Sequence, residues 1–337
     1  MIPLLLGAAL AADPLPKGIE LPIRVSSAVS VSELSGVDEA ASTFDGTVDV
    51  VLRWHDPGVA FDAQVAGTDR KIFTGDDADT KLGDIWDPAV DVANLTGDPA
   101  DREASLRLHA NGDVEYIQRI RGSFTTPIEL ARFPFDHQHL QVELDAPRYN
   151  SRQVQLVHTQ ADAELSSVSP RVELPEWVVG ERVRFEGDEV RGLDGMTHSE
   201  IAGGVEITRV TRSFVASLFA PLAVILLLPC LCIWVRTDIH ERINWVITAV
   251  FSLIALNFSV GIEYPALGVD STFMRLFWYG YVAQGVALAL IMVLFNEGRL
   301  AAWLGEDLIE ESLSVLGWTL PLLIALAFGD VMFALAT

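Results

Sequence analysis

The residues with the clearest chemical role lie in one apolar stretch, 243–262, where polar side chains recur among hydrophobic ones. Polar groups inside a hydrophobic helix cost free energy unless they are paired or meet water. One set is spaced by four, three, four, three and four positions, which places its members on a single helical face. These residues are Asn244, Thr248, Phe251, Ala255, Phe258 and Ile262.

This face is polar near its start and apolar toward its end, and Glu241 lies just before it. Several copies of such a helix around an axis would form a water-filled tube, with an acidic ring at one mouth and an apolar constriction above. The same residues also fit an ordinary membrane helix whose hydroxyl groups bond to its own backbone. The residues alone leave both interpretations open.

Motifs for catalysis, metal binding or cofactor binding are absent from the sequence. It contains no glycine-rich phosphate loop, no Gly-x-Ser-x-Gly elbow and no HExxH motif, so an enzyme is not predicted. His137 and His139 share a strand face without a third ligand nearby, and therefore no metal site is predicted. The formal net charge of −23 argues against a nucleic-acid partner, because phosphate binding needs Lys and Arg.

The chain changes character near residue 208. Beyond it, four apolar segments approach the ~20 residues needed to cross a bilayer core of ~30 Å. These spans are 213–235, 243–262, 276–295 and 313–336. Pro221 and Pro229 are expected to break the first span. Arg236, Arg242 and Arg299 lie at ends that would share one side, which predicts that these ends are cytoplasmic and the N-terminal domain is outside.

Residues 13–208 have the pattern of a β-sandwich of the immunoglobulin-like kind. Several short runs alternate with period two: Thr47–Trp54, Val114–Ile120, Leu140–Leu144 and Val154–His158. Asn111-Gly112 between two such runs predicts a tight hairpin turn. Residues 1–12 are apolar and rich in alanine, which predicts a signal peptide, and residues 209–337 form the membrane domain.

Four features occur in a characteristic order along the chain. They are "IWDP" (85–88), "FPFDHQHL" (133–140), Pro221 in the first span, and "ERINWVITAVFSLIALNF" (241–258). From about Ile23 to the end, this pattern resembles the prokaryotic pentameric ligand-gated ion channels, bacterial relatives of the Cys-loop receptors. The two cysteines of that family's signature loop would fall at Thr126 and Leu140, and both are absent here.

The resemblance implies a homopentamer in a bacterial inner membrane, with lipid and permeant monovalent cations as further partners. Residues 241–262 would line the pore, with His240 at its mouth and Arg242 pointing away from the axis. A ring of Glu241 carboxylates would favour cations, and the sequence lacks the Pro-Ala-type alteration of anion-selective relatives. Phe251 is the expected hydrophobic gate, with Phe258 as a second constriction.

The resemblance also implies how the two domains communicate. The loop residues Phe133, Pro134, Phe135 and Asp136 are expected to press against the connection 263–275, in which Pro265 lies near the start. Glu39 and Asp136 would then surround the guanidinium of Arg209 in a charge-assisted cluster. Transmission of motion and simple stapling of the domains both remain open.

The ligand site is less well defined. Positions that hold cage aromatics in amine-binding relatives are occupied by Asp49 and Pro147. The ligand-site residues that the resemblance indicates are Asp49, Asp91, Asp145, Arg148 and Phe185. Two carboxylates with one aromatic ring could bind an amine, a divalent cation or a proton.

Two other functional classes are possible in principle. A membrane-anchored receptor could bind a ligand without conducting ions, but it would have no use for the stripe that starts at Asn244. An exported β-sandwich enzyme with a membrane tail would need a nucleophile or a metal centre, and the sequence shows neither. Asp330, inside the fourth span, is expected to reach the outer interface or to pair with Arg275.

Overall fold

The computed structural model describes residues 14–192, 194–234, 238–268, 271–294 and 306–336. The chain forms two compact units, and each is considered by itself. The first comprises the residues up to 128 together with 138–207, and the second comprises 129–137 and the residues from 208 onward. The predicted signal peptide, Arg236 and Arg299 lie outside the described residues.

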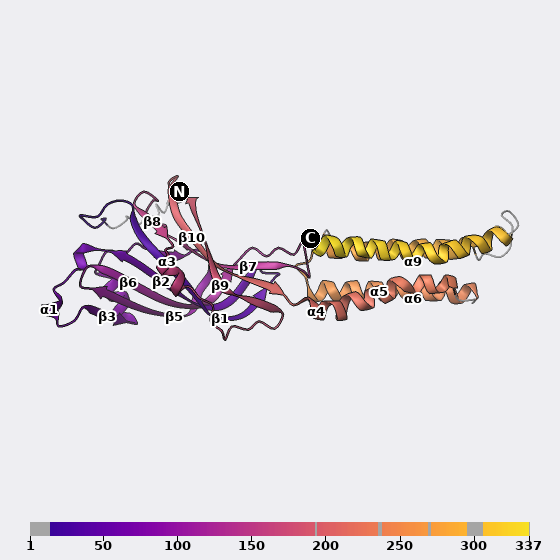
Figure 1. Ribbon diagram of the computed structural model, residues 1–337, viewed down its shortest axis with the longest axis horizontal. Helices are drawn as coiled ribbons and strands as arrows, with labels where there is room; N and C mark the ends of the chain where they lie inside the picture. Colours follow the sequence, from indigo (N-terminus) through magenta and orange to yellow (C-terminus); the bar gives the residue numbers. More distant parts are fainter. Residues whose placement is uncertain (1–13, 193, 235–237, 269–270, 295–305, 337) are drawn as a thin grey trace, which may run out of the picture. The chain divides into compact units, whose positions relative to one another are not determined.

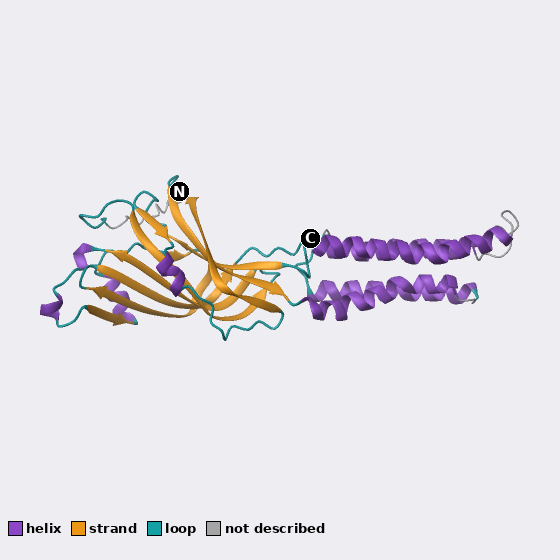
Figure 2. Ribbon diagram, viewed as in Figure 1, coloured by secondary structure: helices purple, strands orange, loops and turns teal. Residues whose placement is uncertain are grey.

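The first unit consists of two β-sheets, which confirms the predicted β-sandwich (Figures 1 and 2). The larger sheet has the order β3-β5-β6-β2-β1-β8, and the smaller has the order β4-β7-β10-β9. The strands of the larger sheet are β1 (Ile23–Asp38), β2 (Thr43–His55), β3 (Arg70–Thr74), β5 (Leu95–His109), β6 (Asp113–Thr125) and β8 (Val154–Val157). Those of the smaller sheet are β4 (Asp91–Val92), β7 (His137–Asp145), β9 (Trp177–Arg191) and β10 (Thr197–Arg209).

The alternation read in the sequence corresponds to the side chains that fill the sandwich. In β2, Val48, Val50, Leu52 and Trp54 are all buried, whereas the residues between them are less so. The partner strands β1 and β6 pair with β2 in antiparallel register, and β1 also pairs with β8 in parallel. One hydrophobic core therefore lies between the two sheets.

The predicted hairpin turn lies between β5 and β6. Gly112 has a φ of 92°, in the left-handed region that favours glycine. A Cβ there would also lie 2.9 Å from the Asp56 carbonyl oxygen. Four short helices lie in the loops of this unit. They are a 3₁₀ turn η1 (Pro57–Val59), α1 (Ala63–Ala66), α2 (Asp76–Gly83) and α3 (Gln160–Leu165).

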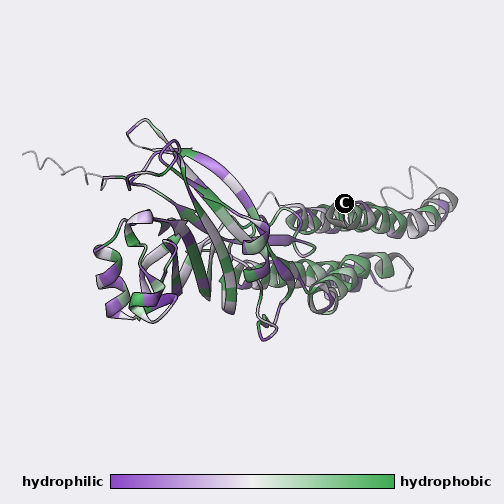
Figure 3. Ribbon diagram, turned by 60° about the vertical axis from the view of Figure 1, so that its left-hand side comes forward, coloured by the Kyte–Doolittle hydropathy of each residue, from purple (hydrophilic) through white to green (hydrophobic). Residues whose placement is uncertain are grey.

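The second unit is helical. Its elements are α4 (Thr211–Phe214), a π-helical segment η2 (Val215–Phe219), α5 (Ala220–Trp234), α6 (Ile239–Glu263), α7 (Thr272–Leu294) and α9 (Glu306–Ala336). Helix α5 contacts α6, α7 and α9, and α7 also contacts α6 and α9. Most residues of these helices are hydrophobic, as the green ribbons in Figure 3 show.

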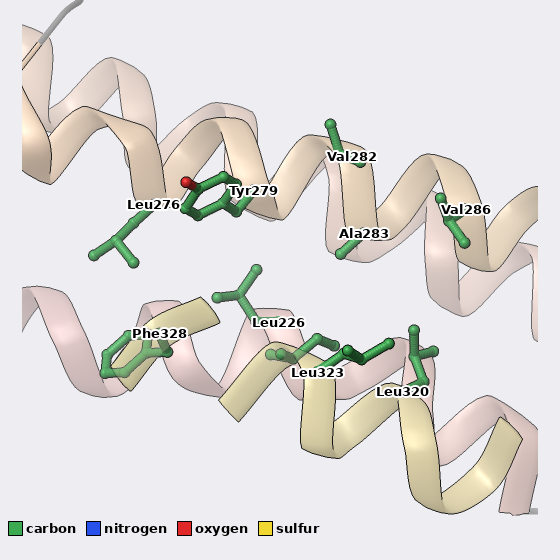
Figure 4. Close-up of a pocket in the computed structure, with 10 residues that line it drawn as sticks. Leu226, Leu276, Tyr279, Val282, Ala283, Val286, Leu320, Leu323 and Phe328 are labelled. Carbon is green, nitrogen blue, oxygen red and sulfur yellow. The ribbon is translucent and has the colours of Figure 1, made fainter. Parts of the chain in front are cut away.

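Two helices are long and apolar enough to cross a membrane, 239–263 and 272–293. The first and fourth predicted spans correspond to shorter apolar stretches, Ala216–Leu231 and Gly317–Val331. An apolar cavity of about 260 Å³ lies among α5, α7 and α9, lined by Leu226, residues of the 276–286 segment and residues of the 320–328 segment (Figure 4).

The expectation that proline breaks the first span is wrong at Pro229, because α5 continues through it. A proline at this position cannot donate a hydrogen bond to the carbonyl of Ile225, four residues earlier. That carbonyl instead accepts a hydrogen bond of 3.0 Å from the side-chain amide of Gln284 on α7. Ahead of Pro221 the chain widens into the π-helical segment η2.

Candidate functional site

Helix α6 has two distinct faces in the folded chain. Arg242, Val246, Ala249, Leu253 and Val260 are buried on the side that packs within the unit. These positions follow helical spacing, so the helix is held by one continuous face. The opposite face is free to meet another molecule or solvent.

Every residue of the predicted stripe lies on that opposite face. All members are exposed: Asn244, Thr248, Phe251, Ala255, Phe258 and Ile262. The exposed fraction is 67% for Phe251, 70% for Phe258 and 78% for Ile262. Large apolar side chains are thus exposed in the outer part of the face, while amide and hydroxyl groups occupy its beginning.

Two polar side chains of α6 have partners that the sequence did not specify. The hydroxyl of Thr248 donates to the carbonyl oxygen of Asn244 at 2.7 Å, within the helix itself. Asn257 lies beside the stripe and donates to the phenol oxygen of Tyr281 on α7 at 3.1 Å. The backbone-bonded alternative therefore applies to Thr248, whereas Asn257 ties α6 to α7.

The charged residues at the start of α6 lie on different faces of the helix. His240 and Glu241 are exposed, whereas Arg242 is 4% exposed and lies among the buried residues. Glu241 is also in the first turn of α6, where the positive end of the helix dipole favours a carboxylate. The carboxylate at the helix start is therefore not covered by the neighbouring arginine side chain.

The loop 129–137 belongs to the helical unit, although the sheets precede and follow it in the chain. Phe133 is fully buried there, and its ring lies 5.0 Å from Tyr264, 5.2 Å from Phe214 and 5.5 Å from Phe273. Phe135 packs against the hydrophobic cluster of the same unit. The structure thus brings the loop aromatics to the connection between α6 and α7, within which Pro265 is exposed.

Asp136 and Arg209 form a bidentate ion pair in the second unit. Arg209 donates from Nε and Nη2 to the two carboxylate oxygens at 2.8 and 3.0 Å, and both side chains are almost completely buried. The guanidinium carbon also lies 4.9 Å from the centre of the Phe133 ring. Glu39, the third predicted member, lies in the first unit, so its part in the cluster remains a prediction.

Several carboxylates gather on the smaller sheet of the first unit. Asp91 lies directly opposite Asp145 in the β4–β7 register, a geometry that places Cβ atoms about 5 Å apart. Burial raises the pKa of Asp145, and repulsion from Asp91 raises it further. Burial also raises the pKa of Glu200, together with repulsion from Glu143 and Asp145. Asp145 and Glu200 therefore bind protons more readily than isolated carboxylates.

The other predicted ligand residues do not join this group. Asp49 lies on the larger sheet, where Arg119 binds both of its oxygens at 2.7 and 3.1 Å. Phe185 packs against the core and stacks on His158 with ring centres 3.7 Å apart. Arg148 is exposed. The aromatic ring of Phe185 therefore has His158 and the sandwich core as its neighbours.

Two of the remaining expectations concern residues that the structure describes. Among the described residues no group of three or more His, Cys, Asp or Glu is placed to hold a metal ion. Asp330 and Arg275 are both exposed, and no ion pair joins them in the described part of the chain. His198 was not singled out in the sequence, yet it bonds to two separate loops of the first unit. Asp194 lies four residues earlier in the chain, but the Tyr149 carbonyl lies 49 residues earlier, and no local pattern could have revealed it.

The chain was compared with known proteins. Residues 12–211 match the family model described as "neurotransmitter-gated ion-channel ligand binding domain". A proton-gated ion channel of Gloeobacter violaceus is 22% identical over 253 residues, which cover 75% of this chain and 67% of the relative. A pH-sensitive chloride channel 2 of Drosophila melanogaster is 24% identical over 255 residues, covering 72% and 47%.

A gamma-aminobutyric acid receptor subunit pi of Mus musculus is 20% identical over 241 residues, covering 70% of this chain and 52% of the subunit. The chain thus spans about half the length of these animal relatives. The family model covers more than half of the chain and coincides with the two-sheet unit. From this match, and from the helical unit that follows it, we conclude that the chain belongs to the family of pentameric ligand-gated ion channels.

Proposed function

We propose that this protein is a homopentameric, cation-selective channel of a bacterial inner membrane, with its sandwich domain outside. The observation that carries the proposal is the division of α6 into a buried face and an exposed face with the polar-to-apolar stripe. A lipid-facing surface would not combine the amide of Asn244 with the carboxylate of Glu241, because polar groups in lipid are costly. Around a hydrated axis the same residues have water as a partner.

Cation selectivity rests on Glu241 alone. The relatives include one that is named as a chloride channel, so family membership does not decide the sign of the permeant ion. A ring of carboxylates at the narrow mouth raises the local cation concentration and repels anions. Arg242 lies on the buried face of α6 and does not contribute an opposing charge to the exposed side.

Phe251 and Phe258 are the proposed gates. Each exposes more than half of its surface on the stripe, about one and about three helical turns beyond Thr248. Rings of such side chains can block ions by excluding water from a narrow apolar section. The loop 133–136, bound to α6 and α7 through Phe133, is proposed to transmit motion from the sandwich to these gates.

Protons are the proposed trigger. The carboxylates Asp91 and Asp145 lie opposite each other, and the pKa of Asp145 is raised by burial and by this repulsion. Phe185, the expected cage aromatic, stacks on His158, which disfavours an amine, and the described residues contain no group of three or more His, Cys, Asp or Glu placed to hold a metal ion. Two of the relatives are named for their response to protons or pH.

The test is current recording from purified protein in liposomes while pH, divalent cations and primary amines are varied in turn. We expect acid to open a cation current, and Glu241→Gln to move the reversal potential toward zero under a salt gradient. Glu311→Gln, on the exposed surface of α9, removes the same charge elsewhere and serves as control. An unaltered reversal potential in Glu241→Gln would refute the selectivity assignment.

Phe251→Ser should conduct at neutral pH, because a polar ring no longer excludes water. Leu326→Ser, at a position on α9 that is 60% exposed, should remain closed under the same conditions. Ligand binding without any current in all variants would instead favour a membrane-anchored, non-conducting receptor.

A further inference from the structure

The hairpin formed by β9 and β10 ends in a tip that is tied back to the rest of the first unit by one histidine. His198 lies near the start of β10, and only 12% of its side chain is exposed. Asp194, at the tip, lies four residues earlier and is about half exposed. The loop that follows β7, from Ala146 to Tyr149, lies on the other side of the ring.

Both nitrogens of His198 face atoms that can only accept hydrogen bonds. Nδ1 lies 2.9 Å from the carbonyl oxygen of Tyr149 and 3.3 Å from that of Ala146. Nε2 lies 3.2 Å from each carboxylate oxygen of Asp194. A neutral imidazole carries one N–H and can satisfy only one of these two sides, whereas an imidazolium satisfies both. The geometry therefore matches the protonated ring.

The carboxylates around His198 act in the same direction. Asp194 faces it from its own hairpin, and Asp145 at the end of β7 interacts with it electrostatically, with Asp91 opposite Asp145. The Ala146–Tyr149 loop also holds Arg148, which is exposed, and the Tyr149 phenol, which accepts a hydrogen bond from Trp86 in the core. Burial opposes protonation of the ring, but its hydrogen bonds to Asp194 and to the loop carbonyls leave the pKa of His198 raised.

The backbone of the hairpin closes tightly over this arrangement. A Cβ atom at Gly192 would lie 2.6 Å from Nε2 of His198 and 2.8 Å from a carboxylate oxygen of Asp194. A side chain at this position would have to displace the imidazole or the carboxylate from the contact. Gly192 also donates a backbone hydrogen bond to Met196 across the tip, at 2.8 Å. The imidazole and the carboxylate are thus enclosed by the turn that they hold together.

We propose that His198 is a proton-operated latch for the β9–β10 hairpin: the protonated ring ties Asp194 at the tip to the Ala146–Tyr149 loop, and the neutral ring releases it. The latch itself requires only this domain, whereas its effect on conduction rests on the proposed function. Since Asp145 ends the strand that leads into the same loop, closing the hairpin covers the flank of the proposed proton-binding carboxylates. Acid would then protonate both His198 and these carboxylates.

Hydrogen exchange of the full-length protein, followed by mass spectrometry, tests the latch. Exchange in the segment 187–197 is compared at pH 5.5 and pH 8, after normalisation to the β1–β2 segment of the same sample. We expect protection of the tip to fall about tenfold or more at the higher pH, as loss of a charge-assisted hydrogen bond requires. His198→Gln should exchange rapidly at both values.

Two variants keep the test decisive if His198→Gln folds poorly. Asp194→Asn retains an oxygen that can accept but loses the charge, so its pH dependence should shrink. Asp188→Asn removes a carboxylate from the same hairpin that does not contact His198, and its pH dependence should match that of the unmodified protein. Equal protection at both pH values, or a pH effect that survives in His198→Gln, would overturn the latch.

The outcome for the latch is separate from the outcome for the channel. A protein that shows the exchange difference but conducts no ions in liposomes would remove the proposed function and keep the latch. A protein that conducts in acid while its tip exchanges identically at both pH values would keep the channel and remove the latch.

Discussion

The hydrogen bond from Gln284 to the carbonyl oxygen of Ile225 should stabilise the protein because Pro229 cannot donate to that carbonyl. The Ile225 carbonyl lacks its usual helical donor, since residue 229 has no N–H. Gln284 is completely buried and donates to that carbonyl at 3.0 Å from the neighbouring helix. The perturbation is Gln284→Leu, which keeps the approximate volume and removes the donor.

The expected magnitude follows from two opposing effects. Leaving a buried carbonyl unpaired costs about 1–3 kcal/mol, and hydrogen bonds between membrane helices are worth about 0.6 kcal/mol on average and about 1.7 at most. The Gln284 amide oxygen has no hydrogen-bond partner among the described residues, so removing it offsets part of this cost. The net loss should be about 1 kcal/mol.

In a Pro229→Ala background the same substitution should cost nothing. Alanine restores an N–H at residue 229, which can bond to the Ile225 carbonyl within the helix. Unfolding of the four proteins in detergent, titrated with a denaturing surfactant, gives the coupling free energy between the two positions. Tyr281→Phe serves as control, because it weakens the bond to Asn257 on α6 and should be additive with Pro229→Ala.

The reasoning is refuted if Gln284→Leu has the same effect with proline and with alanine at residue 229. Coupling smaller than about 0.5 kcal/mol is the ordinary scatter of independent sites. A full effect in the alanine background would mean that Gln284 acts through packing alone, and that the carbonyl of Ile225 is satisfied in some other way.

Three more substitutions give distinct expectations. Asp136→Ala removes the carboxylate that accepts two hydrogen bonds from the buried guanidinium of Arg209 and should destabilise the protein by about 3–5 kcal/mol, seen as a lowered melting temperature, whereas an unchanged melt would show that the pair contributes little. Gly280→Val should lower the free energy of unfolding by about 1–3 kcal/mol, since a Cβ at Gly280 would lie 2.8 Å from a side-chain carbon of α6. Gly285→Val, with open space around it, should lower it less, and equal losses of stability would contradict this reasoning. Asp145→Asn should stabilise the protein at neutral pH, because the raised pKa of Asp145 means that the fold disfavours its ionised form. The stability that protonation of Asp145 provides is present in acid and is lost as pH rises through that pKa. The melting difference should vanish below pH 4, and a constant difference would exclude this cause.

Most of the fold could be predicted from the sequence, because its elements depend on local patterns. Alternation in β2 and the Asn111-Gly112 turn each specify their own geometry, and the spacing from Asn244 to Ile262 specifies one helical face. These features need no knowledge of distant residues. The first span was misjudged because Pro229 is compensated by Gln284, 55 residues further along the chain.

The candidate sites were only partly predictable, because their contacts join residues that are distant in the sequence. The resemblance to a known family pointed to Asp136 and Arg209, which the structure joins directly. The side-chain direction of Phe185 depends on the register of β9 with its neighbours, and the structure turns it toward His158 and the core. His198 depends on carbonyls about 50 residues away, which neither spacing nor composition encodes.

The loop between β6 and β7 is closed at its base without sulfur. The hydroxyl of Thr126 donates to the carbonyl oxygen of His139 at 2.8 Å, next to Leu140, where relatives of the Cys-loop type would carry a covalent cross-link. Such a bond forms as soon as the strands pair and does not depend on thiol oxidation. The domain can therefore mature without oxidative folding enzymes, and reducing agents should leave its assembly and its response to acid unaltered.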